Sequence, residues 1–397
     1  MTTALEPPSA GPFRPSSPEY LADPYGHLRE LRERGRVCVD PATGIWFLLR
    51  FDDVEAGLTR ITRGHERHHT FPANPFAADG PGHTGPRRVI MPTFTNRAVQ
   101  HFRDRAQQIV DEALEGKAAS SEAGAELRVV DELGFPLPFH LTCDILGVPE
   151  VANVHELREW TWKSLALIDA FLSPEQTKDY LEAAGNLAGH LREVIEWKRD
   201  HLADDVVSTV IATADEGDVM RPDQVVSYVH TLYLAGMHTT VNQTALSLHA
   251  LMQHRDQWNL LVRQPELLDN AVEELLRFEP TAQYMRRSGT SEHEIGGVKI
   301  PPGTEVICWI ASANRDEQRW GPTADQLDIT REDARTHIAF GKGPHVCVGS
   351  WLARLELQVV VGTLIERYPN TELVEQELQW TSNFIRGPEE LVLRLRS

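Results

Sequence analysis

The chain lacks long apolar runs and excess positive charge, and both shortages exclude classes of protein. No stretch of its 397 residues approaches the roughly eighteen consecutive apolar residues of a membrane span, and the first residues hold no basic region followed by an apolar one. The net charge of −19 would repel nucleic acid and anionic membranes as main partners. The sequence therefore predicts a soluble, cytoplasmic protein whose main partner is neither a nucleic acid nor a membrane.

Cysteine is also scarce, and its spacing excludes the common cysteine-based sites. Cys38, Cys143, Cys308 and Cys347 lie far apart and form no C-x-x-C pair, so neither a disulfide framework nor a zinc site of common spacing is predicted. The chain has no G-x-G-x-x-G fingerprint in a βαβ setting and no ferredoxin-type cysteine cluster. A built-in nucleotide-binding or iron–sulfur domain is therefore not expected.

Helical spacing of apolar residues dominates the chain, with a smaller share of strand patterns. Residues 1–18 are rich in Pro and Ser and predict an extended arm, and residues 23–35 predict a helix that Gly35 ends. Residues 36–54 and 294–316 alternate and turn like small sheet regions, whereas residues 98–217 are mostly helical. The fold class is therefore mainly α with a minor β region, without regular βαβ alternation.

The longest helical pattern begins at Pro222 and Asp223 and continues for about thirty residues without another proline, which predicts a helix of about 45 Å. Its middle carries Gly236, Thr239 and Thr240, all poor helix formers. Something other than local propensity must explain these three residues.

Cys347 stands in the segment "FGKGPHVCVG", residues 340–349, among three glycines and a histidine. A helix is expected to begin just after it, because Trp351, Leu352, Leu355, Val359 and Val360 recur on one helical side. A cysteine at a helix N-terminus is favoured as a thiolate, which is typical of a metal ligand or a nucleophile. The alternative is a turn with an incidental buried cysteine, which leaves the glycines and His345 unexplained.

This segment resembles the F-G-x-G-x-H-x-C-x-G loop of cytochrome P450 enzymes at every specified position. The resemblance implies that Cys347 is the axial thiolate of a haem b iron, that Phe340 shields the sulfur and that His345 binds a haem propionate. Gly341 and Gly349 are the matching loop glycines. Thiolate donation to iron favours O–O cleavage.

The E-x-x-R motif of the same family appears as Glu274 and Arg277, which a helix would place face to face. The family's third partner is usually an arginine, but the matching stretch offers Gln326 and Leu327, so Arg331 is the candidate substitute.

Two further stretches resemble family elements that bind the haem propionates, "GHTGPRRV" with His83 and Arg87, and "RRSGTSEHEIGG" with Arg287. Arginine suits this task because its guanidinium binds carboxylates in bidentate fashion. The matches span most of the chain and imply one cytochrome P450 domain, residues 19–397, with haem between the long central helix and the cysteine loop.

The segment "AGMHTT", residues 235–240, resembles the distal helix motif of the family. The resemblance implies that Ala235 and Gly236 leave room for oxygen and that Thr239 takes part in proton delivery. His238 stands where the family usually has Asp or Glu. A histidine with a pKa near 6.5 can also relay protons near neutrality.

The resemblance also indicates which stretches face the substrate, and they mix aromatic and hydrogen-bonding side chains. The candidate pocket residues are His69, Phe71, Trp162, Met237, Gln283, Tyr284, Asn383 and Phe384. The mixture favours a medium-sized, partly polar substrate, aromatic or peptide-derived, over a plain hydrocarbon.

Three functions stay open at this stage. The leading hypothesis is a monooxygenase that hydroxylates a natural product. The substitution at His238 admits a second outcome, oxidative coupling of two substrates without oxygen insertion, and a non-catalytic haem-binding protein is the third. For either enzyme a separate ferredoxin and its reductase would supply electrons, with Lys342 and Arg354 as candidate docking residues on the cysteine side.

Overall fold

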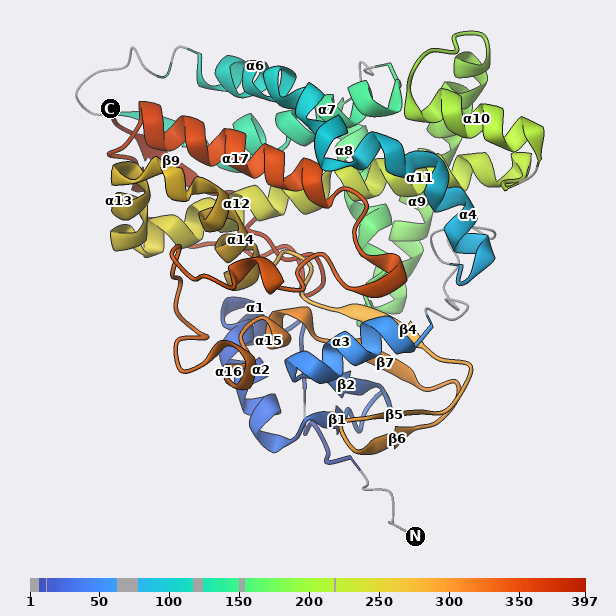
Figure 1. Ribbon diagram of the computed structural model, residues 1–397, viewed down its shortest axis with the longest axis vertical. Coiled ribbons are helices and arrows are strands. Elements are labelled where there is room, and N and C mark those ends of the chain that lie inside the picture. The colour runs from blue at the N-terminus through green and yellow to red at the C-terminus, as the bar shows by residue number, and fades with distance from the viewer. Residues whose placement is uncertain are drawn as a thin grey trace.

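A computed structural model describes residues 7–11, 13–62, 78–115, 117, 124–149, 154–217 and 219–397. Helices form its wide end and a small sheet forms its narrow end, where the N-terminal helices lie beside strands β4 to β7 (Figure 1). The helices are α1 Pro18–Ala22, α2 Pro24–Arg34, α3 Phe51–Arg60, α4 Pro81–Ile90, α5 Asn96–Val99, α6 Arg103–Leu114, α7 Pro136–Leu146, α8 Val154–Ala166, α9 Pro174–Arg199, α10 Val206–Glu216, α11 Val225–Gly236, α12 His238–Gln253, α13 Arg255–Arg263, α14 Leu268–Phe278, α15 Ile310–Ala313, α16 Glu317–Trp320 and α17 Ser350–Arg367.

The largest sheet joins strands that are far apart in sequence. Its order is β1-β2-β7-β4, in which β2 and β7 pair in parallel and the other neighbours pair antiparallel. Strands β5 and β6 form a hairpin whose turn residues, Gly296 and Gly297, both have positive φ, as a tight two-residue turn requires. The strands are β1 Val37–Val39, β2 Trp46–Leu48, β3 Ala125–Arg128, β4 Met285–Ser288, β5 His293–Ile295, β6 Val298–Ile300, β7 Glu305–Cys308, β8 Glu372–Leu373 and β9 Val392–Leu395.

Helix ends follow local sequence signals. Helix α9 begins with a capping box in which Ser173 and Gln176 satisfy each other's backbone N–H groups, and Pro174 occupies the first helical position. Helix α10 begins at the side-chain cap of Asp205 and ends at Gly217, whose φ is 77°. Gly35 ends α2 as the sequence predicts.

The expected N-terminal arm is extended over its described part but packs against the body. Ser9 forms a parallel bridge with Val39, and Phe13 makes edge contacts with Phe47 and Trp309 at ring-centroid distances of 5.2 and 5.6 Å. These aromatic contacts anchor the arm to the sheet at the narrow end.

The prediction of one continuous helix after Pro222 is wrong, because the helix breaks at Met237. Helix α11 ends at Gly236 and α12 begins at His238, and Met237 between them has φ −96° and ψ −85°, outside helical values. The break falls in the stretch where the sequence holds its poorest helix formers.

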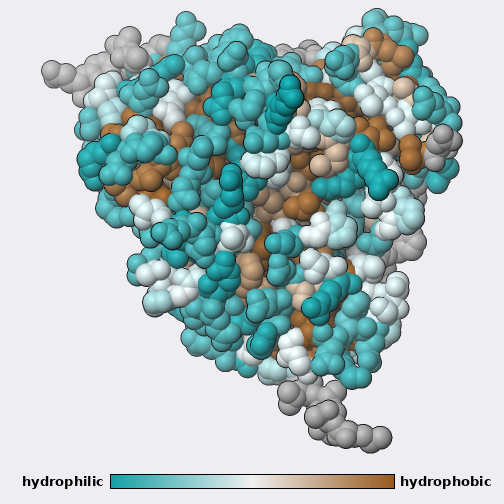
Figure 2. Space-filling model, in the orientation of Figure 1, coloured by the Kyte–Doolittle hydropathy of each residue, from teal (hydrophilic) through white to brown (hydrophobic). Residues whose placement is uncertain are grey.

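The surface agrees with the acidic composition. On the face in Figure 2, hydrophilic residues cover most of the periphery, and hydrophobic residues show through in the middle, between the wide and the narrow ends. Among the described helices, none combines the length and the hydropathy needed to span a bilayer.

Candidate functional site

The loop of Cys347 is held by backbone geometry that its glycines permit. The Cys347 N–H donates to the Phe340 carbonyl at 2.9 Å, and Gly341 and Gly343 adopt φ of 72° and 75°. A Cβ on Gly343 would lie 3.1 Å from Thr59 Cγ2 of α3, so packing also demands glycine there. Helix α17 begins at Ser350, three residues after Cys347, in agreement with the expectation that a helix begins just after the cysteine.

Cys347 differs from the other cysteines in its exposure. Cys38, Cys143 and Cys308 are buried, whereas Cys347 is exposed. Nearby protein atoms raise the pKa of its thiol by desolvation, while the Gly349 N–H and the charges of Arg87 and Arg354 oppose this effect. Of the four thiols, Cys347 is the one that can reach a ligand.

Helix α4 brings two predicted cationic residues to the cysteine loop. His83 Nε2 lies 3.2 Å from the Pro344 carbonyl oxygen, and the Arg87 guanidinium donates to the Val346 carbonyl at 2.5 Å. The rings of His83 and His345 lie 4.0 Å apart between centroids. His345 Nε2 lies 3.1 Å from Asp79 Oδ1. The fourth predicted residue, Arg287, is buried on β4, where its guanidinium donates to the Arg286 carbonyl.

The pair Glu274 and Arg277 forms a fully buried, bidentate ion pair, with nitrogen–oxygen distances of 2.7 and 2.8 Å. Arg277 also donates to the carbonyls of Asn314, Ala324 and Gln326, while the Gln326 side chain takes no part. Arg331 Nε lies 3.3 Å from Glu274 Oε1, so the arginine suggested as the third partner does reach this pair.

At the helix break, Ala235 is exposed and Thr239 is partly exposed. The Thr239 hydroxyl donates to the Ala235 carbonyl at 2.8 Å. Gly236 has a packing role, because a Cβ there would lie 2.6 Å from Thr142 Oγ1 on α7. Its small size permits this close helix crossing.

The contacts of His238 argue against the predicted proton relay near neutrality. Its ring turns toward α8, where Nε2 lies 2.8 Å from Thr161 Oγ1 and 3.2 Å from the Arg158 carbonyl oxygen. Trp162, a predicted pocket residue, packs against the same ring with centroids 5.5 Å apart. Burial, helped by the charge of Arg158, lowers the pKa of His238 to about 3. His238 is therefore neutral at pH 7.

Four of the predicted pocket residues lie in the core. Gln283, Tyr284, Asn383 and Phe384 are buried, and the Tyr284 ring packs against Phe384 and Trp309 at centroid distances of 5.1 and 4.9 Å. Aromatic packing between β4, β7 and the C-terminal segment closes this region. Met237 is also fully buried, and His69 and Phe71 lie outside the described residues.

Sequence reasoning missed two buried glutamates, and both carry a signal. Glu356 lies on the apolar side of α17, which is an unusual place for an acid, and its Oε1 has no hydrogen-bond partner. Burial raises the pKa of Glu356 to about 8, although Thr240 of α12 forms a hydrogen bond with it. Glu273 precedes the E-x-x-R glutamate and binds Arg354. The signal for each was a charged residue within a hydrophobic helix pattern.

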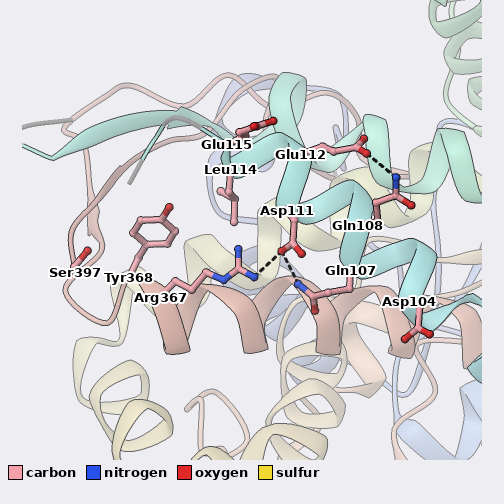
Figure 3. A pocket seen from close by; sticks show the side chains of 10 residues that line it. All are labelled: Asp104, Gln107, Gln108, Asp111, Glu112, Leu114, Glu115, Arg367, Tyr368 and Ser397. Carbon is pink, nitrogen blue, oxygen red and sulfur yellow. Dashed lines mark hydrogen bonds and ion pairs between the residues drawn. The ribbon is translucent and has the colours of Figure 1, made fainter. Parts of the chain in front are cut away.

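A hollow with a volume of about 810 Å³ lies between α6 and the C-terminal part of α17 (Figure 3). Two of its acidic side chains have partners, since Asp111 binds Arg367 at 2.7 Å and Glu112 binds Gln108 at 2.7 Å. Arg367 ends α17, and Cys347 precedes its first residue, so the hollow belongs to the other end of that helix. It is lined by Asp104, Gln107, Gln108, Asp111, Glu112, Leu114, Glu115, Arg367, Tyr368 and Ser397.

The fold is mainly helical, and its exposed cysteine lies in a glycine-containing loop beside His83 and Arg87 from a remote segment. This arrangement suits a protein that binds a cofactor through a cysteine. The family model for cytochrome P450 matches residues 260–391. The cytochrome P450 monooxygenase PikC of Streptomyces venezuelae is 34% identical, over 95% of this chain and 92% of the relative. The mycinamicin IV hydroxylase/epoxidase of Micromonospora griseorubida is 31% identical, over 97% and 98%.

The solved haem domain of CYP116B5 from Acinetobacter radioresistens superposes with a TM-score of 0.89 at 26% identity, covering 97% of each chain. The chain belongs to the cytochrome P450 family. It is an enzyme with the single-domain fold of that family, and its cofactor is haem b bound through a cysteine thiolate.

The residues present fit this cofactor. An exposed thiol offers the soft ligand that iron accepts in this family, and neighbouring histidine and arginine side chains suit the negative carboxylates of a porphyrin. The other three cysteines are buried, so none of them competes for the role.

Proposed function

We propose that this enzyme is a monooxygenase that hydroxylates a medium-sized, partly polar natural product, aromatic or peptide-derived. Cys347 would ligate the iron, and His83, Arg87, Arg287 and His345 would bind the propionates. The haem supplies the oxidising chemistry: O2, two electrons and two protons convert a C–H bond to C–OH and release one water. The exposure of Cys347, alone among the four cysteines, is the observation that carries the proposal.

Protons would reach the reaction through threonines at the helix break and not through His238. The Thr239 hydroxyl lies at the exposed side of the break, and it keeps its orientation through the bond to the Ala235 carbonyl. Glu356, bonded to the adjacent Thr240, holds a proton at pH 7 because its pKa is raised to about 8. A buried, protonated carboxyl bonded to Thr240 supports a proton reservoir at α12.

The neutral state of His238 favours a second candidate, oxidative coupling. In that reaction two substrate C–H or N–H groups lose one hydrogen each and join. The two hydrogens combine with O2, two electrons and two protons to form two waters. An acid beside Thr239, which the family usually uses for proton delivery, is missing here, and the imidazole is directed to α8. Similarity to enzymes such as the mycinamicin IV hydroxylase/epoxidase supports hydroxylation as the first candidate.

Electrons would come from a ferredoxin and its reductase, docking on the cysteine side. Arg354 is less available for docking because it forms a buried ion pair with Glu273. Lys342 forms an ion pair with Glu55, with a nitrogen–oxygen distance of 3.1 Å. The exposed Arg97 lies on α5, a helix that contacts α17, and it is left to attract an acidic partner.

The test is the optical spectrum of the reduced protein with carbon monoxide. The wild type and Cys38→Ala are expected to show the shifted Soret band of a thiolate-ligated haem, and Cys347→Ala to lack it. A band that survives in Cys347→Ala would overturn the ligand assignment. Product mass then separates the candidates, because hydroxylation adds one oxygen, whereas coupling joins two substrates with loss of two hydrogens.

A further inference from the structure

Glu273 is a buried carboxylate at the centre of a cluster of charged side chains. This cluster is separate from the residues proposed to bind the haem propionates and the iron. Glu273 lies on α14 and accepts two hydrogen bonds from Arg354 of α17, at 2.8 and 2.9 Å. His337 Nε2 lies 3.1 Å from its Oε2. Arg335 reaches Oε1 at 3.1 Å, but its side chain is 68% exposed. Glu273 thus connects α14, α17 and the segment that leads into the cysteine loop.

The charge states in this cluster are defined by the contacts. Hydrogen bonds from His337 and Arg354 outweigh burial and lower the pKa of Glu273 to about 2, so its carboxylate is ionised at pH 7. Burial lowers the pKa of His337, whose Nδ1 accepts the Ala339 N–H, so neutral His337 donates through Nε2. Arg354 is therefore the buried cation that neutralises Glu273.

The same two partners flank Phe340, the loop residue whose carbonyl accepts the Cys347 N–H. The Arg354 guanidinium lies 4.6 Å from the centre of the Phe340 ring, and the His337 ring lies 5.8 Å from it. A cation over an aromatic face is attracted by the ring. The Arg354 guanidinium also donates to the Ser350 carbonyl at 3.1 Å, and this bond holds the guanidinium in place independently of Glu273.

We propose that Glu273 is a positioning residue that sets the electrostatic potential at the Cys347 sulfur by neutralising Arg354. The inference rests on the proposed role of Cys347 as the iron ligand. Only 14% of the Arg354 side chain is exposed, so its charge is weakly screened once its counter-ion is gone. An uncompensated positive charge favours the ferrous state, which carries one positive charge less than the ferric state. Loss of Arg354 leaves Glu273 without its buried counter-ion and favours the ferric state, because the exposed Arg335 is screened by solvent.

The experiment measures the ferrous-to-ferric ratio of the holoenzyme at a fixed applied potential. Glu273→Gln should raise the ratio by about threefold or more, Arg354→Gln should lower it by a similar factor, and the double variant should return close to the wild type. Arg335→Gln is the matched control, because an exposed charge is screened, and it should leave the ratio unchanged.

Opposite shifts distinguish charge compensation from structural damage, which would move both single variants in the same direction. The inference is overturned if both single variants shift the ferrous-to-ferric ratio in the same direction, or if Glu273→Gln leaves it unchanged. In either case a normal carbon monoxide spectrum would still support the proposed function. If Glu273→Gln does not fold, Arg354→Gln and the double variant are compared, and the double variant must have the higher ratio. A wild type without the thiolate band overturns both proposals.

Discussion

His238 Nε2 lies 2.8 Å from Thr161 Oγ1, and this contact turns the residue before Thr239 away from the exposed side of the helix break. The Thr161 hydroxyl also lies 2.8 Å from the Leu157 carbonyl oxygen, to which it donates. The Thr161 oxygen can then accept a hydrogen bond from the N–H of the His238 imidazole. A neutral histidine thereby joins α12 to α8.

The buried state of His238 predicts a pH-dependent stability. Its pKa is about 3 when folded and near 6.5 when unfolded, so the unfolded chain binds a proton first as pH falls. The contribution is complete above pH 6.5 and is lost progressively down to pH 3. Between pH 7 and pH 5 the loss amounts to about 2 kcal/mol.

Urea unfolding at both pH values measures this loss, which His238→Gln should remove. The exposed His101 offers the matched control, His101→Gln, which should keep the wild-type dependence. An unchanged pH dependence in His238→Gln would contradict the buried neutral state.

Glu356 predicts the opposite dependence on pH. Its pKa is raised from 4.5 to about 8 on folding, so the folded protein keeps a proton that the unfolded chain releases, and stability decreases as pH rises from 4.5 to 8. Glu356→Gln should therefore be more stable than the wild type at pH 7, by up to about 3 kcal/mol. Denaturant titration of Glu356→Gln and of Glu366→Gln, an exposed position on the same helix, checks this; a destabilised Glu356→Gln contradicts it.

The proposed proton reservoir predicts which substitution uncouples electron use from product formation. Glu356→Gln should lower the product formed per electron severalfold and raise peroxide release, because the amide cannot supply a proton. His238→Gln should keep the wild-type ratio within about twofold, since its ring faces α8. Parallel assays of product and peroxide decide the matter, and the reverse pattern would assign proton delivery to His238.

The crossing of α11 and α7 predicts that Gly236 tolerates no side chain. Gly236→Ala would bring a Cβ to 2.6 Å from Thr142 Oγ1 and should destabilise the protein by about 1–3 kcal/mol. Adding Thr142→Ala should restore part of the loss. Gly185→Ala, on α9 with no atom near the new methyl group, should instead stabilise by about 0.5–1 kcal/mol. Thermal unfolding compares the three variants, and a Gly236→Ala as stable as the wild type would rule out the steric role.

By itself the sequence determined the chemistry of the cysteine loop and the class of fold. The glycines of residues 340–349 act through backbone angles that each residue sets locally, and the spacing of Glu274 and Arg277 fixes their pairing on one helix. Such features depend on neighbours within a few positions, so a short motif is enough to predict them.

Tertiary structure alone decided the surroundings of His238, Glu356 and Tyr284. The imidazole is neutral because α8 removes it from water, the carboxyl keeps its proton because α12 covers it, and the phenol lies in the core because segments from both ends of the chain close over it. Desolvation and packing depend on atoms supplied by remote segments, and a linear sequence does not state which segments those are.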